Sequence, residues 1–177
     1  MKHRIPALLF LLPAILCTGC TAALLPPTPA ELLSYETGSF VCAFTAEDDG
    51  IGTPVILVRD KSGDTMTVTE PHSRVVFRFA AGQTLLVTQP SPEEASITVP
   101  LTLPNDHGVG AWQPLFCTAE TEDMTVSRTE DGWRLDSAPD KSPLSLYFSD
   151  EKKPVRLERD GIVLNITEFT ITEGQEP

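Results

Sequence analysis

Basic residues, cysteines and aromatic residues are all scarce in this chain of 177 residues. Only 13 lysines and arginines stand against 25 aspartates and glutamates, so the formal net charge is -12. A chain this acidic lacks the basic patch that displaces counterions from nucleic acid, and charge alone does not draw it to anionic lipid. These two kinds of partner are therefore disfavoured. Hydrophobic residues still make up 41% of the chain, which is enough to bury the core of one domain.

The sequence patterns of common catalytic and metal sites are also missing. There is no Gly-x-Ser-x-Gly elbow, no phosphate-binding glycine loop and no His-Glu-x-x-His motif. His72 and His107 are isolated and lack the spacing of zinc ligands, and the acidic clusters at 47–49 and 60–64 lack that of a calcium loop. We therefore expect no catalytic residue, no metal and no cofactor. An enzyme whose carboxylates pair only in space stays open as an alternative.

No apolar run in the chain is long enough to cross a bilayer comfortably. The most apolar stretch, residues 5–16, follows the charged start made by Lys2 and Arg4, which is the layout of a secretory signal peptide. It ends in Leu16-Cys17-Thr18-Gly19-Cys20, which resembles the bacterial lipobox. In that pattern small residues precede a cysteine that becomes the mature N-terminus. The sequence departs from it at Cys17, where leucine is usual.

The lipobox resemblance implies cleavage between Gly19 and Cys20 and a diacylglycerol on the Cys20 thiol. The protein would then be extracytoplasmic and anchored to a bacterial membrane through Cys20. Loss of residues 1–19 removes Lys2 and Arg4, so the mature charge would be -12 minus 2, or -14. An ordinary signal peptide with a chance cysteine, or an uncleaved anchor, is the alternative.

The remaining chain divides into a short tether and one domain. Residues 20–29 carry the lipidated cysteine and three prolines, which stiffen a linker. Residues 30–177 show no internal repeat and no second domain. Where the tether meets this domain, Thr28-Pro29-Ala30-Glu31 has the form of a capping box, which predicts one short helix over 29–36.

From Ser39 onward the dominant hydrophobic period is two, which is typical of half-buried strands. Turn signals such as Asp131-Gly132 and Asp160-Gly161 separate the alternating runs. Ten or so short strands joined by tight turns predict a single antiparallel sheet, apolar on one face and polar on the other. The fold class is therefore mainly β (α+β).

Three local features refine this sheet. Ile166 and Phe169 are three residues apart, so the last strand must change parity near Thr167, which predicts a β-bulge there. Pro100 inside an alternating run predicts an edge strand. In the last hairpin, Val155 is expected on the same face as Leu157.

Cys42 and Cys117 are the only thiols left once Cys20 is lipidated. Export permits a disulfide between them. The alternative is two free thiols, because Cys42 shares its face with Phe40 and Phe44 and would be buried. The sequence leaves both open.

The whole pattern resembles the LolA/LolB superfamily of lipoprotein carriers. The resemblance rests on the lipobox, the short helix ending at Ser34-Tyr35-Glu36-Thr37-Gly38-Ser39-Phe40, and the stretches from Met66 to Gly82 and from Pro143 to Phe169. Anchored clostridial germination lipoproteins of the GerS type look closest. The resemblance implies a curved half-barrel with one or two short helices on its concave face. Carriers of this superfamily shelter acyl chains there, whereas GerS-type members hold a cell-wall amidase.

One segment is expected to cover this concave face. Residues 106–120 are rich in glycine and apolar side chains, which permits a short helix or an apolar loop. We expect Val109 to Phe116 to lie over or beside the face and to line an apolar groove with Phe77 and Leu146. Trp112 is the better candidate for an exposed contact, whereas Trp133 alternates with Leu135 and is expected in the core.

These expectations favour a membrane-anchored extracytoplasmic binding module. Its occupant would be an apolar ligand, such as an acyl chain, or a protein partner from the cell envelope. An extracytoplasmic enzyme with unrecognised carboxylate chemistry is an alternative from another class, and a structural envelope protein is a third.

Overall fold

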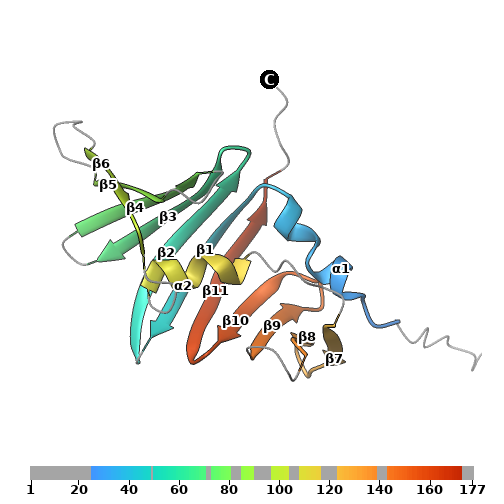
Figure 1. Cartoon of the computed structure of the whole chain (residues 1–177). Coiled ribbons are helices and arrows are strands. Elements are labelled where there is room, and N and C mark those ends of the chain that lie inside the picture. The colour runs from blue at the N-terminus through green and yellow to red at the C-terminus, as the bar shows by residue number, and fades with distance from the viewer. Residues whose placement is uncertain are drawn as a thin grey trace, which may run out of the picture.

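An antiparallel sheet of eleven strands dominates the computed structural model (Figure 1). The structure describes residues 25–48, 50–70, 73–80, 85–89, 97–103, 108–116, 123–138 and 143–172. The strands are β1 (Phe40–Asp48), β2 (Ile51–Asp60), β3 (Gly63–Glu70), β4 (Ser73–Ala80), β5 (Leu85–Gln89), β6 (Ile97–Leu101), β7 (Thr125–Arg128), β8 (Gly132–Asp136), β9 (Leu144–Ser149), β10 (Pro154–Arg159) and β11 (Ile162–Ile171).

The strand order is β6-β5-β4-β3-β2-β1-β11-β10-β9-β8-β7, with every neighbouring pair antiparallel. Two meanders, β1–β6 and β7–β11, therefore meet where the first strand pairs with the last. The sheet curves around one face, which we call the inner face, and the opposite face is the outer face (Figure 1). The predicted fold class, a single curved antiparallel sheet with short helices on its concave face, is confirmed.

Among the described residues, four short helical segments accompany the sheet: α1 (Pro29–Leu32), η1 (Ser34–Thr37), α2 (Gly108–Trp112) and η2 (Gln113–Phe116). The predicted capping box is present, because the Glu31 backbone N–H donates to the Thr28 hydroxyl and the Glu31 carboxylate accepts from the Thr28 N–H. The single helix predicted over 29–36 is instead split at Leu33 into an α-helical turn and a 3₁₀ turn.

The predicted bulge lies where β1 pairs with β11. Ala43 is opposite Glu168 and Phe44 is opposite Ile166, so Thr167 is the extra residue on β11. The Thr167 hydroxyl donates to the Ala43 carbonyl at 3.1 Å across the bulge. The change of parity lets residues on both sides of Thr167 contribute apolar side chains to the inner face, and a bulge of this kind also increases the local twist.

The proline prediction is also confirmed, because Pro100 lies in β6, at one edge of the sheet. The expectation for Val155 is wrong. Where β10 pairs with β9, a second register shift falls between Pro154 and Arg156. Val155 is therefore exposed, while Pro154 and Leu157 are both buried. A buried proline, which has no N–H to pair, begins this strand and displaces the alternation by one residue.

The core lies between the inner face and the helical segments. Its largest fully buried side chains come from both meanders and from α1 and η2, and each contributes roughly 1.5–3 kcal/mol by leaving water. They are Phe40, Phe116, Phe148, Leu32, Leu57, Met66, Leu115, Leu135, Leu146, Leu157, Leu164 and Pro154. Trp133 is buried, as predicted.

The predicted signal peptide, with Gly19 and Cys20, and residues 20–24 of the tether lie outside the described residues. Within the described ranges, none of the helices has the length and apolar character needed to cross a bilayer.

Candidate functional site

The segment α2–η2 lies across the centre of the inner face, as Figure 1 shows. Its apolar side chains face the sheet, and Val109, Ala111, Trp112, Leu115 and Phe116 are all buried. The Phe116 ring lies 5.4 Å from the ring of Phe44 and 6.2 Å from that of Phe40. Aromatic pairs at such distances add packing energy beyond the area they bury. The segment therefore covers the centre of the concave face.

The other cover comes from η1, through Tyr35. Its ring makes edge-on contacts with Phe40 at 5.8 Å and Phe169 at 5.5 Å, and a tilted contact with Phe148 at 6.3 Å. These three phenylalanines belong to β1, β11 and β9. One aromatic side chain from the N-terminal segment therefore contacts strands of both meanders.

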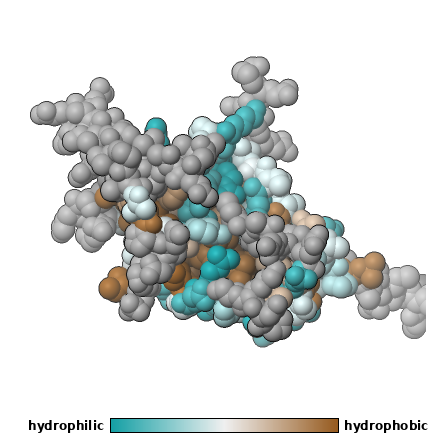
Figure 2. Space-filling view, viewed as in Figure 1, coloured by the Kyte–Doolittle hydropathy of each residue, from teal (hydrophilic) through white to brown (hydrophobic). Residues whose placement is uncertain are grey.

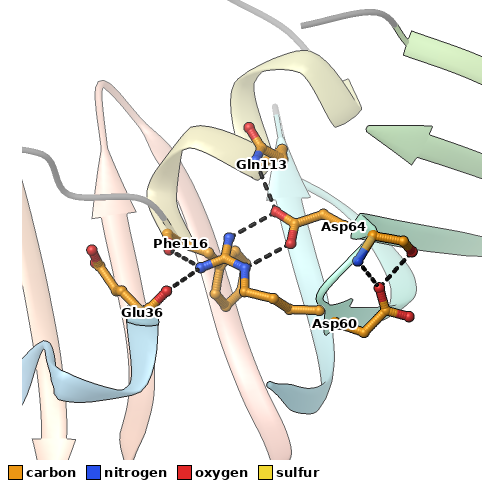
Figure 3. A network of polar contacts seen from close by, with 7 residues as sticks. Glu36, Asp60, Asp64, Gln113 and Phe116 are labelled. Atoms are coloured by element: carbon orange, nitrogen blue, oxygen red, sulfur yellow. Dashed lines mark hydrogen bonds and ion pairs between the residues drawn. The ribbon is translucent and has the colours of Figure 1, made fainter. Parts of the chain in front are cut away.

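A buried polar node fixes both covers to the sheet (Figure 3). Arg59, on the inner face of β2, forms a two-pronged ion pair with Asp64 of β3: Nε to Oδ1 at 2.6 Å and Nη2 to Oδ2 at 2.7 Å. Arg59 Nη1 also donates to the Phe116 carbonyl at 2.9 Å and to the Glu36 carbonyl at 3.2 Å. Gln113 Nε2 completes the node by donating to Asp64 Oδ2 at 2.8 Å.

The ion pair at the centre of the node is largely buried: only 10% of the Arg59 side chain and 6% of the Asp64 side chain are exposed to solvent. The guanidinium also lies over the Phe40 ring, 5.0 Å from its centroid. A buried ion pair adds little net stability, but it requires a defined geometry. We infer that Arg59 sets the position of η1 and of η2 over the apolar face.

The sequence-predicted groove residues come together, but they form a closed core. Val109, Trp112, Phe116 and Leu146 are buried members of one cluster, and Phe77 packs against it while half-buried. Trp112, expected as an exposed contact, is only 5% exposed. Its indole N–H has no hydrogen-bond partner among the described residues.

The inner face is less completely covered toward β4. Val75, Phe77 and Phe79 are half-buried there, whereas their neighbours Val68 and Met66 on β3 are buried. In the strand register, Phe77 pairs with Val87 of β5, and Val87 pairs with Val99 of β6. Figure 2, in the same view as Figure 1, shows hydrophobic residues around the centre of the molecule, with hydrophilic residues beside them.

Cys42 carries a free thiol in the structure and is fully buried, which raises its pKa to about 12. Cys117 lies outside the described residues, so the Cys42–Cys117 disulfide is not described. A protonated buried thiol is a poor nucleophile, so Cys42 is a core residue.

Residues that could coordinate a metal do not gather within the described ranges, where no group of three or more His, Cys, Asp or Glu is close enough. His72 and His107 both lie outside those ranges. The described acidic residues with lowered pKa values are Glu31, Asp60 and Glu151, whose carboxylates accept hydrogen bonds chiefly from Thr28, Ser62 and Lys153, respectively. These contacts are local and well separated, and they assemble no acid–base pair.

Comparison with known proteins adds little. No family model matches the chain, and no curated protein matches it. Among solved structures, the crystal structure of MucB is similar, with 10% sequence identity and a TM-score of 0.42 over 84% of this chain. The chain spans 60% of that chain's length. A likeness this distant carries no argument about this chain.

Proposed function

We propose that this protein is a lipoprotein, held at the extracytoplasmic side of a bacterial membrane by acylated Cys20, and that its half-barrel is a binding module. The lipobox-like sequence around Cys20 supports the anchor. The site we propose is the inner face beside α2, at Val75, Phe77 and Phe79 of β4. The resemblance to acyl-chain carriers, stated above for the sequence, agrees with this choice.

The observation that carries the proposal is the uneven cover of the inner face. Apolar side chains extend along it from β4 to β8, but the residues of α2–η2 and η1 contact chiefly the strands around β1 and β11. Phe77 and Phe79 remain half-buried. An apolar occupant such as an acyl chain would remove more of their surface from water, at roughly 25 cal/mol for each Å².

A protein partner is the second candidate. It is favoured by the closure of the centre of the face, where Trp112 and Phe116 fill the space that a larger ligand would need. The extracytoplasmic enzyme and the structural envelope protein stay as alternatives.

The anchor is tested by replacing Cys20 with alanine in the full chain. The variant should be exported without acylation and should move to the aqueous phase in detergent partitioning. A Cys20→Ala protein that remains in the detergent phase would show that something else holds the protein at the membrane.

The binding site is tested with an environment-sensitive acyl probe added to the soluble Cys20→Ala protein. Phe77→Ser should weaken probe binding about tenfold or more, because it removes an aromatic ring from the proposed site. The matched control is Phe169→Ser, since Phe169 is also a half-buried inner-face phenylalanine but lies against Tyr35. Equal loss in both variants, or no probe binding by the parent protein, would contradict the acyl-chain proposal.

A further inference from the structure

The indole N–H of Trp112 is buried under the cover of the inner face without a hydrogen-bond acceptor. Trp112 is only 5% exposed, and its Nε1 atom has no partner among the described residues. A buried donor that loses water and gains no acceptor destabilises the folded state, so nearly all such donors in proteins are bonded. An acceptor carried by a bound molecule would satisfy this N–H and explain why the fold retains it.

The contacts of Gln113 show where this N–H lies. α2 runs directly into η2, and Gln113, which follows Trp112 in the chain, donates to Asp64 of β3 (Figure 3). In the strand register Asp64 is directly opposite Phe79 of β4, which is half-buried. Trp112 is therefore held near β3, at the border between the closed centre of the inner face and the less covered strand β4.

Trp112 is also on the side of α2 that faces the sheet. Trp112 and Gln113 follow Val109 by three and four residues, so the three share one side of this helical turn. Val109 and Trp112 are both buried members of the core cluster against which Phe77 and Phe79 pack. The unpartnered donor and the proposed acyl site therefore lie on the same side of α2.

We propose that the Trp112 indole is the polar contact of the acyl site, and that the occupant is an ester-linked acyl chain whose carbonyl oxygen accepts from Nε1. The assignment rests on the proposed acyl-binding function and narrows it to one class of ligand. The hydrocarbon tail packs on Phe77 and Phe79, while the carbonyl reaches the unpartnered donor beside them. Where water is excluded such a hydrogen bond is strong, and leaving it unmade is costly.

Charge and bonding capacity argue against other acyl chains in this position. The net charge is -12, and the nearby cation Arg59 is already bonded to Asp64 and to two backbone carbonyls. The carboxylate of a free fatty acid would lose water there without gaining a cation. An amide-linked chain would bring an N–H of its own, for which Val75, Phe77 and Phe79 supply no acceptor. An ester carries acceptors only, which suits a single indole donor.

The first test compares two lipids that differ only at the carbonyl, as competitors of the environment-sensitive acyl probe on the soluble Cys20→Ala protein. Monopalmitoylglycerol, an ester, should bind about three- to tenfold more tightly than the matching hexadecyl ether, as expected for one net hydrogen bond. Trp112→Phe keeps an aromatic ring but removes the N–H, so it should abolish this preference by weakening the ester alone. Palmitate should bind more weakly than the ester.

The chain contains two tryptophans, which provide a matched control and a direct signal. Trp133 is also buried but lies in β8, which six strands separate from β4. Trp133→Phe should therefore leave both affinities unchanged, and it makes Trp112 the sole tryptophan. Its fluorescence emission should shift to longer wavelength when the ester bonds its N–H, and the ether should cause no such shift. This measurement does not require Trp112→Phe to fold.

Different outcomes separate the ester assignment from the function on which it rests. Equal binding of ester and ether, an ester preference that survives Trp112→Phe, or tighter binding of palmitate would overturn the assignment and leave the acyl site in place. Ester binding without a shift in the emission of Trp112 would do the same. Failure of both lipids to bind would overturn the assignment and the acyl-binding function together.

Discussion

Removal of the Arg59 guanidinium should cost far more stability than removal of an equally close but exposed arginine. We take Arg59→Met as the perturbation, because methionine retains much of the apolar stem. The variant leaves the Asp64 carboxylate, 6% exposed, without its cationic partner. It also removes the Arg59 donor from the carbonyls of Phe116 and Glu36. Loss of one partner from a buried ion pair typically costs about 3–5 kcal/mol.

The chain supplies its own control. Arg128 and Asp150 also have an N–O distance of 2.6 Å, but 51% and 68% of their side chains are exposed. Water screens such a pair, so Arg128→Met should cost about 1 kcal/mol or less. The shortest N–O distance is the same in the two pairs, so the difference between the variants reflects the burial of Arg59, its second contact with Asp64 and its bonds to the two carbonyls. A total stability of about 5–15 kcal/mol makes the Arg59 loss easy to measure.

The measurement is urea unfolding followed by far-ultraviolet circular dichroism and by the fluorescence of Trp112 and Trp133. The double variant Arg59→Met/Asp64→Leu should recover much of the lost stability, because it removes the stranded charge as well. The reasoning is refuted if Arg59→Met costs no more than Arg128→Met. It is also refuted if the double variant is as unstable as the single one.

Three further predictions concern single sites elsewhere in the fold. Thr28→Ala should cost about 0.5–2 kcal/mol in urea unfolding, because it removes the hydroxyl that caps α1. Gly132→Ala should prevent stable folding, because its Cβ would collide with the Phe148 carbonyl. The control Gly161→Ala meets no atom within 4 Å and should cost only about 1 kcal/mol, from its positive φ. The thermal unfolding transition measures both effects. Cys42 should resist thiol reagents until the protein unfolds, in a Cys117→Ala background. Because burial raises the pKa of the Cys42 thiol from its ordinary value of 9.0 to about 12, its contribution to stability should be complete below pH 9 and lost as the pH rises toward 12.

The features predicted from sequence are those that depend on local chemistry. The Thr28 capping box, the Thr167 bulge and the edge position of Pro100 each follow from a few neighbouring residues, and each is present. Val155 was misplaced because a bulge at a strand start leaves no mark on the alternation of polar and apolar residues. Burial of Trp112 was missed because a five-residue helix is too short to show a periodic apolar side.

The Arg59 node shows where such reasoning stops and where it could have gone further. Alternation places Arg59 on the same face as Val55 and Leu57, and Asp64 on the same face as Met66 and Val68. A tight turn between β2 and β3 sets Arg59 directly opposite Asp64. Two residues of opposite charge, at paired positions on the apolar sides of neighbouring strands, therefore predict a buried ion pair.

The partners of that pair lie beyond any local pattern. The Phe116 carbonyl is 57 residues from Arg59 along the chain, and the Glu36 carbonyl is 23 residues away. A backbone carbonyl has no sequence signature, so neither contact could be predicted without the path of η1 and η2. The charge pair shows that something polar must close the apolar face at this point, because an arginine with five N–H donors is not satisfied by one carboxylate. The guanidinium N–H groups that do not bond Asp64 thus imply a cover over the sheet, although only the structure identifies which segments provide it.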